Sequence, residues 1–189
     1  MARRKSVGWK KATIAFTMVS FSTLAVPPFV DDIMDSKEKS PQVMNNEQDA
    51  RFVRETIRKL RSGDTEAKID AASDLSEMAL FGRCKKQLNM AILPLAKALT
   101  SERDPFVRQE SAKALESIAE LGIAEIQDAK PALMKSLEDY FPNVRVASAR
   151  ALVKLNDQDA IEVLRKMMKK EKDSFAKRDI ELALRSVKD

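Results

Sequence analysis

The chain has 189 residues, of which 33% are charged, 44% hydrophobic and 5% aromatic, with four glycines, one cysteine and no histidine. Without histidine, Ser–His and Cys–His nucleophile pairs and histidine–metal sites are excluded, and four isolated glycines exclude a glycine-rich phosphate loop. The net charge of +5 is carried by Arg3, Arg4, Lys5, Lys10 and Lys11, and the rest of the chain is neutral overall. We therefore expect no nucleic-acid partner.

Residues 1–30 combine this basic start with an uncharged stretch, Ala12–Val30, which is followed by Asp31 and Asp32. This order is typical of a secretory signal peptide, with Ala25 as the candidate cleavage site. The uncharged stretch also nearly spans a bilayer, so a signal anchor at residues 12–30 is a second interpretation. A transit peptide is a third, because the leader is rich in Ser, Thr and basic residues. We expect an exported protein, periplasmic or secreted, or a membrane-anchored one with its folded part outside the cytoplasm, ahead of organelle import.

Residues 31–50 are polar and contain Pro41 and two consecutive asparagines, which predicts a linker. Residues 51–189 then show the apolar periodicity of helices throughout, in four helix pairs at 51–82, 87–122, 126–156 and 157–189. The first helix of each pair places apolar residues on one face. These are Val53, Ile57 and Leu60; Ile92, Leu95 and Leu99; Leu133 and Leu137; Ile161, Leu164 and Met168.

The clearest second helix is the stretch "DPFVRQESAKALESIAELG", from Asp104 to Gly122. Asp104 is predicted to cap the helix by accepting backbone N–H bonds, and Pro105 fits the first helical position. Gly122 stands where a left-handed residue would end the helix. The stretch thus predicts one helix with a defined start and end.

The same pattern occurs in all four pairs when they are aligned on one basic residue. The aligned basic residues are Lys68, Arg108, Arg145 and Lys177. Four residues later stand Ala72, Ala112, Ala149 and Glu181, and seven residues later stand Leu75, Leu115, Leu152 and Leu184. Such repeats predict helix pairs that stack into a solenoid, because one pair cannot bury its apolar face alone.

The motifs "DPFVRQESAKAL" and "NVRVASARAL" resemble the second helix of the HEAT-repeat family, and Pro94 and Pro131 match the proline of its first helix. The resemblance covers residues 47–189 and is similar to the short, Ala-rich bacterial type that includes phycobilin lyase-like repeats. It implies an all-α fold: a short right-handed α-solenoid of about four HEAT-like helix pairs, here preceded by an N-terminal apolar leader or anchor. It also implies binding to other proteins.

In this family the aligned basic residue pairs with an aspartate at the turn of an adjacent unit. The resemblance therefore implies an inter-repeat ladder formed by Asp64, Lys68, Asp104, Arg108, Arg145, Asp173 and Lys177.

Two other features are interpreted as having no function. Cys84 lies in "FGRCKKQ", where Arg83 and Lys85 would lower a thiol pKa, so a reactive thiol or a bilin-attachment role is the alternative to a plain loop cysteine. The densest basic cluster, Leu164–Lys172, is interpreted as a solvated helix face.

The sequence predicts a non-enzymatic protein-interaction module that binds its partner on a concave face lined by the second helices, with no cofactor, metal or small-molecule substrate. The partner-binding residues predicted there are Gln109, Lys113, Arg150, Lys154, Arg178 and Arg185. One alternative is a structural subunit of a membrane protein complex, anchored by residues 12–30. Another is an accessory or chaperone subunit in tetrapyrrole (bilin) attachment.

Overall fold

The computed structural model describes residues 46–187, which form eight α-helices and one 3-10 helix and no strand. The elements are α1 (Asn46–Ser62), α2 (Thr65–Leu80), α3 (Lys85–Ser101), α4 (Pro105–Glu120), η1 (Ala124–Ala129), α5 (Lys130–Ser136), α6 (Pro142–Leu155), α7 (Gln158–Lys170) and α8 (Ser174–Arg185). The predicted leader, its cleavage site at Ala25 and residues 31–45 of the predicted linker lie outside the described residues. Within residues 46–187, no helix combines the length and apolar character needed to cross a bilayer.

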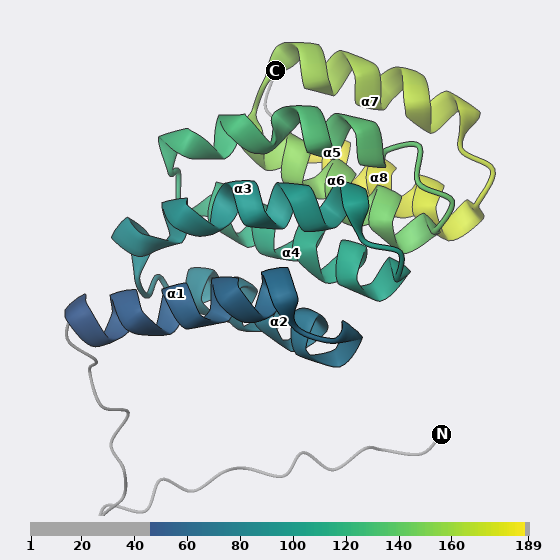
Figure 1. The fold of residues 1–189 in the computed structure, drawn as a ribbon. Coiled ribbons are helices and arrows are strands. Elements are labelled where there is room, and N and C mark those ends of the chain that lie inside the picture. Colours follow the sequence, from purple (N-terminus) through teal and green to yellow (C-terminus); the bar gives the residue numbers. More distant parts are fainter. Residues whose placement is uncertain (1–45, 188–189) are drawn as a thin grey trace, which may run out of the picture. The chain divides into compact units, whose positions relative to one another are not determined.

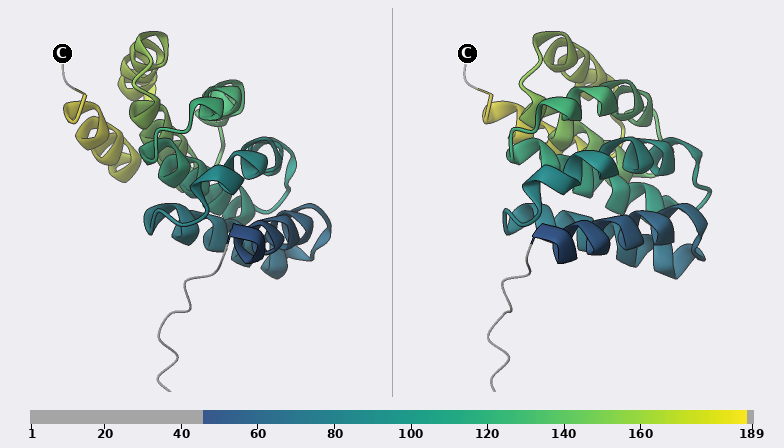
Figure 2. Two further views of the ribbon diagram at one scale, coloured as in Figure 1. Left: turned by 90° about the vertical axis from the view of Figure 1, so that its left-hand side faces the viewer. Right: turned by 60° about the vertical axis from the view of Figure 1, so that its left-hand side comes forward.

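The helices stack in two layers (Figures 1 and 2). The second helices α2, α4, α6 and α8 pack side by side in one layer, and the first helices α1, α3 and α5 pack side by side in the other. The core lies between the layers, where Leu75, Leu115 and Leu152 are fully buried. The observed architecture is the predicted all-α solenoid of helix pairs.

Small residues let the second helices approach one another closely. Ala72, Ala112 and Ala149 occupy the same repeat position and are fully buried, whereas Glu181 holds that position in the last unit and is exposed. Hydroxyl groups fill some of the remaining space: Ser76 and Ser117 join α2 to α4 through an O···O contact of 2.9 Å. The small residues that recur at this repeat position therefore set how closely neighbouring second helices pack.

The helix ends follow from identifiable residues. Asp64, Asp104 and Asp173 each cap a second helix, accepting backbone N–H groups at 2.8–3.3 Å. Asp157 caps α7 in the same way at 3.0 Å. Gly122 follows α4 with a φ of +62°, a left-handed conformation that favours glycine, as the sequence predicts.

Two boundaries differ from the prediction. Helix α1 begins at Asn46, inside the stretch predicted to be a linker, because Glu47 and Asp49 provide an acidic first turn that favours a helix start. The first helix of the third unit is divided into η1 and the short α5. After Ser136 the chain tightens into turns in which the N–H groups of Leu137 and Glu138 bond carbonyls three residues earlier.

Ion pairs between neighbouring units connect the second helices to the unit that follows. Lys68 Nζ lies 3.0 Å from both carboxylate oxygens of Glu102. Arg108 binds Asp139 through two nitrogens at 2.6 and 2.8 Å, and Arg145 binds Glu171 through two nitrogens at 2.7 Å each. These three contacts form the inter-unit ladder.

The acidic partners in the ladder are not the aspartates that the family resemblance implied. Asp64, Asp104 and Asp173 use a carboxylate oxygen to cap their own helices. In each pair the observed partner is instead the acid that stands six residues before the aligned basic residue of the next unit. Lys177, in the last unit, is exposed and makes no ion pair with the described residues.

Each arginine of the ladder also holds the turn of its own unit. Arg108 Nη1 donates to the carbonyl oxygens of Glu102 and Arg103 at 3.1 and 2.9 Å, and Arg145 Nη1 binds the two equivalent carbonyls. The two arginine side chains are 8% and 14% exposed, so they are largely removed from water. A planar guanidinium has enough donors, in a suitable geometry, to bind the carboxylate and both carbonyls at once. The ammonium group of a lysine does not have this geometry.

The ladder changes the ionisation of its acids. The hydrogen bond from Arg145, opposed by burial, lowers the pKa of Glu171. Burial of Asp139 favours its neutral form, but the bonds from Arg108 and from the N–H of Phe141 outweigh it, and the pKa of Asp139 is also lowered. Both acids therefore stabilise the fold in their charged form.

We expect Arg108→Ala to lower the free energy of unfolding by about 3 kcal/mol, because it leaves the buried carboxylate of Asp139 without its partner. Urea denaturation followed by circular dichroism measures the change. Arg51→Ala is the matched control, since the Arg51 side chain is 73% exposed in its pair with Glu47, and should cost less than about 0.5 kcal/mol. Equal losses in the two variants would contradict the structural role of the ladder.

We expect Glu171→Gln to destabilise the protein at pH 7 and to lose much of that effect in acid. The native pKa of Glu171 is lowered, so its contribution is complete above the unfolded-state value of about 4.5 and disappears as the pH falls through the native value. Unfolding free energies of wild-type and variant measured between about pH 7 and pH 3 test this. A difference that stays constant over that range would show that ionisation of Glu171 is not involved.

Candidate functional site

The outward surface of α4, α6 and α8 contains two neighbouring hollows, and four of the six predicted partner-binding residues line them. Gln109, Lys113 and Arg150 line the first hollow, and Arg150 and Lys154 line the second. Arg178 and Arg185 line neither of them. Arg178 lies 3.9 Å from Asp179 and is 79% exposed, and Arg185 pairs with Glu181 at 2.8 Å on the same helix.

The first hollow has a volume of about 470 Å³ and is lined by residues of α4, α6 and α8 and of the turns before α6 and α8. We call it the second-helix hollow. Its lining is Gln109, Lys113, Glu116, Phe141, Pro142, Asn143, Val146, Ala147, Arg150, Asp173, Phe175, Ala176 and Asp179. Apolar side chains and charges of both signs thus share one concave site.

Phe141 and Phe175, at the starts of α6 and α8, line one side of this hollow, and neither was among the predicted site residues. Phe106 and Phe141 pack edge to face, with ring centroids 5.6 Å apart and an angle of 70° between the ring planes. Phe175 is 75% exposed. The signal in the sequence is a phenylalanine close to the start of each of the last three second helices, which is compatible with core packing as well as with binding.

The predicted cations of the hollows are already paired. Arg150 lies 3.0 Å from Glu116, and Lys154 lies 2.5 Å from Glu120, so two ion pairs join α6 to α4. Lys113 pairs with Glu110 at 2.7 Å on its own helix. The surface is therefore a set of ion pairs with an aromatic edge rather than a free basic row.

Two polar groups within the second-helix hollow are poorly solvated. The Glu116 side chain is 14% exposed, and its burial raises its pKa even though Arg150 favours the charged form. The side-chain oxygen of Gln109 is buried and accepts no hydrogen bond from the described residues.

Cys84 lies away from this surface, at the start of α3, and its environment does not favour the alternative of a reactive thiol. Its side chain is buried, and burial together with the nearby Asp49 raises the thiol pKa to about 11, against the opposing effect of Arg83. The neighbouring cations therefore do not produce a reactive thiolate. Within residues 46–187, no group of three His, Cys, Asp or Glu side chains is placed to hold a metal ion.

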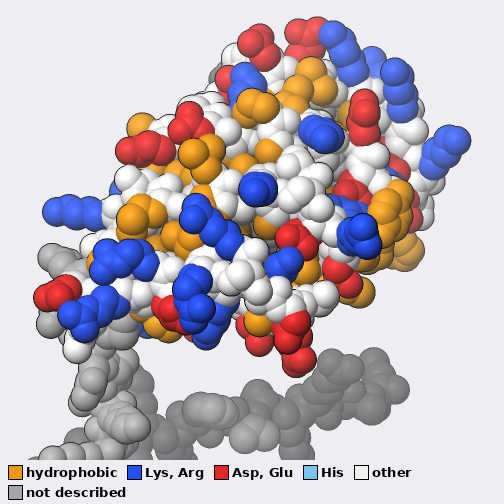
Figure 3. Space-filling model, viewed as in Figure 1, with side chains coloured by type: hydrophobic (Ala, Val, Ile, Leu, Met, Phe, Trp, Pro, Cys, Tyr) orange, Lys and Arg blue, Asp and Glu red, His pale blue; other side chains and the backbone are white. Residues whose placement is uncertain are grey.

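The face viewed in Figure 3 shows Lys and Arg interspersed with Asp and Glu, and hydrophobic side chains scattered between them. No large area of a single charge sign is visible on this face. Such a surface lacks the continuous basic stripe that tracks a nucleic-acid backbone.

Residues 92–185 match the model of the family described as HEAT repeats. No match is found among curated proteins. Among solved structures, the chain is similar to an engineered protein of the Northeast Structural Genomics Consortium, with 29% identity, a TM-score of 0.58 and 69% of this chain covered. The match spans about 60% of that protein's length.

A second similar structure is the complex of CpcE and CpcF of phycocyanin lyase from Nostoc sp. PCC7120. It has 17% identity and a TM-score of 0.48, and the match covers 70% of this chain and 98% of that one. The family match, the stacked helix pairs and the repeated second-helix motif agree with one another. Residues 92–185 therefore belong to the HEAT-repeat family, and the stacked helix pairs of the described chain have the same architecture.

Proposed function

We propose that this protein is a non-enzymatic interaction scaffold that binds a protein partner on the second-helix hollow. The observation that carries the proposal is the exposed aromatic edge of a concave site, where Phe175 is 75% exposed. Aromatic residues next to a concave surface are common anchors of protein interfaces. HEAT repeats as a fold are suited to this use, because stacking gives them an extended surface.

The chemistry of the hollow defines the kind of partner segment that fits. An apolar side chain can enter against Phe141 and Val146, which line the hollow. Charged groups beside it would meet Arg150 or Asp179. Because the local cations are paired with acids, binding should depend on shape and the aromatic contact more than on net charge.

We further propose that the repeats act outside the cytoplasm, after export or on a membrane anchor at residues 12–30. The support is the basic and then uncharged order of the first thirty residues. If the leader is retained, a structural subunit of a membrane complex becomes the favoured form of the scaffold. A role in bilin attachment stays a prediction from the family resemblance.

Site-directed photo-crosslinking tests the binding face. A benzoylphenylalanine at Asn143, which is exposed in the second-helix hollow, should give a defined partner adduct in cells of the source organism. The same group at Glu125, which is exposed on η1, should not. Equal adducts from both positions would contradict the proposed face.

Phe175→Ala should reduce the Asn143 adduct by about fivefold or more, because a truncated aromatic anchor costs more than about 1 kcal/mol of binding free energy. Phe52→Ala is the matched control, since Phe52 is an exposed phenylalanine on α1, outside this surface. Quantitative mass spectrometry of the adduct gives the ratio. Unchanged adduct in Phe175→Ala would remove the aromatic edge from the interface.

The intact mass of the protein in soluble and membrane fractions tests the location. A soluble form that begins near Val26 indicates an exported scaffold, and a full-length form in the membrane fraction indicates an anchored subunit. A full-length form in the cytosolic fraction would contradict both.

A further inference from the structure

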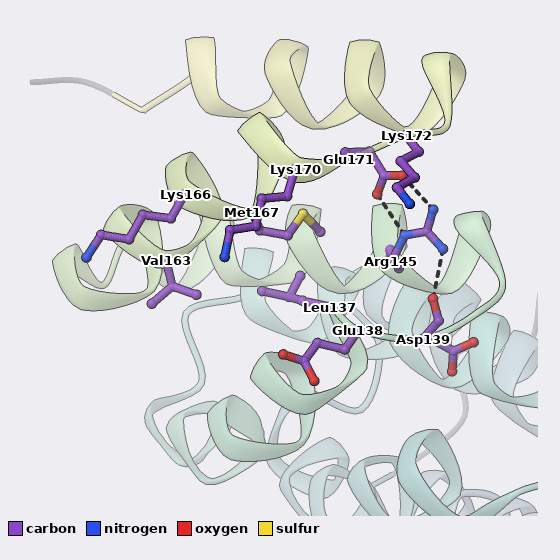
Figure 4. Close-up of a pocket in the computed structure, with 10 residues that line it drawn as sticks. All are labelled: Leu137, Glu138, Asp139, Arg145, Val163, Lys166, Met167, Lys170, Glu171 and Lys172. Carbon is purple, nitrogen blue, oxygen red and sulfur yellow. Dashed lines mark hydrogen bonds and ion pairs between the residues drawn. The ribbon is translucent and has the colours of Figure 1, made fainter.

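A second cleft lies in the other layer, between α7 and the end of α5 (Figure 4). It has a volume of about 460 Å³ and is lined by Leu137, Glu138, Asp139, Arg145, Val163, Lys166, Met167, Lys170, Glu171 and Lys172. We call it the α5–α7 cleft. It is separate from the second-helix hollow, with which it shares no lining residue.

The cleft exists because the first-helix layer is interrupted at this point. Helices α1, α3 and α5 pack on their neighbours in turn, but α7 makes no comparable contact with α5. Helix α5 ends at Ser136, whereas α3 and α7 are longer, so α5 offers α7 little surface. One side of α7 is therefore left without a packing partner from the described residues.

The unpacked side of α7 is apolar along its middle. Val163 and Met167 stand four residues apart on α7, and both point into the cleft opposite Leu137 (Figure 4). Val163 and Met167 remain half-buried, while Leu137 is 3% exposed. This row of three side chains forms an apolar floor that a further helix could cover.

The rim of the cleft carries a surplus of positive charge that the ladder does not neutralise. The carboxylates of Asp139 and Glu171 are engaged by Arg108 and Arg145. That leaves three lysines, opposed in the lining only by Glu138. The lysines are Lys166, Lys170 and Lys172.

Two of these lysines have no acidic partner within the described chain. Lys166 contacts Glu162 at 2.6 Å, in a pair whose side chains are 68% and 67% exposed, whereas Lys170 and Lys172 make no ion pair there. Lys166 and Lys170 are four residues apart, so they stand one above the other beside the apolar row. The basic cluster that the sequence analysis interpreted as a solvated face thus borders an apolar cleft.

We propose that the α5–α7 cleft is a second docking surface, and that it takes an acidic amphipathic helix of a partner protein. Apolar side chains at three- and four-residue spacing would cover Leu137, Val163 and Met167. Carboxylates one turn apart would meet Lys166 and Lys170. This surface is independent of the second-helix hollow, and either can bind without the other.

The test uses the full-length protein and a fluorescein-labelled helical peptide of about 16 residues, or about 24 Å of helix. The peptide carries Leu and Met on one face and Glu on both sides of that face. Fluorescence anisotropy should show saturable binding that weakens with added salt. A peptide of the same composition in scrambled order should bind at least about tenfold more weakly.

Variants locate the binding. The pair Lys166→Glu with Lys170→Glu should weaken binding by about tenfold or more, and Met167→Ser should weaken it by a similar factor. Lys169→Glu is the matched control, because Lys169 is exposed on α7 but does not line the cleft, and should change affinity by less than about twofold. Circular dichroism confirms that each variant is folded.

Several outcomes would overturn the proposal. They are no saturable binding, equal binding of the scrambled peptide, equal weakening by Lys169→Glu, and equal affinity for a single-stranded oligonucleotide. A fifth is binding that appears only after Asp31, Asp32 and Asp35 are changed to Asn, which would make the chain's own acidic stretch the occupant. The Asn143 adduct reports on the second-helix hollow alone, and the peptide reports on the α5–α7 cleft alone. Failure of one proposal can therefore be told apart from failure of the other.

Discussion

The bidentate bond from an arginine of one unit to a carboxylate of the next is the interaction on which this array depends. Arg108 and Arg145 each hold two carbonyls of their own turn and an acid of the following unit, so one side chain sets both the turn and the spacing. The contacts are buried, and removing one partner would leave the other charge without solvation. Burial of the apolar faces between units drives folding. These bonds fix the position of each unit relative to the next.

The same register places the two candidate binding surfaces on opposite layers. On the second-helix layer, small buried residues bring α4 and α6 together, and Arg150–Glu116 and Lys154–Glu120 cross the line between them. On the first-helix layer, the acids Asp139 and Glu171 are bound by arginines of the ladder, so they do not pair with the lysines near them. The second-helix hollow thus has paired charges and an aromatic edge. The α5–α7 cleft has an excess of lysines beside an apolar floor.

Much of the fold could be predicted from the sequence, because caps, periodicity and repeat register are local properties. Asp104 and Gly122 mark the ends of α4, and the aligned leucines are buried in the first three units. The acidic partners of the ladder could not be predicted, because a carboxylate can either cap its helix or bind an arginine, and only the geometry separates Asp104 from Asp139. For Cys84, only the alternative of a reactive thiol was based on its charged neighbours, and burial dominates the thiol pKa.

Within residues 46–187, Lys177 has no ladder partner, and this affects how the array opens. The unit formed by α7 and α8 is tied to its neighbour by the Arg145–Glu171 and Lys130–Asp157 ion pairs and by contacts of both helices with α6, while the middle units are tied on both sides. In a nearest-neighbour array such an end opens with the least free energy, so amide hydrogens of α7 should exchange sooner than those of α4. A helix seated between α5 and α7 would add the missing contact and slow that exchange, which couples occupancy of the cleft to the order of the terminal repeat.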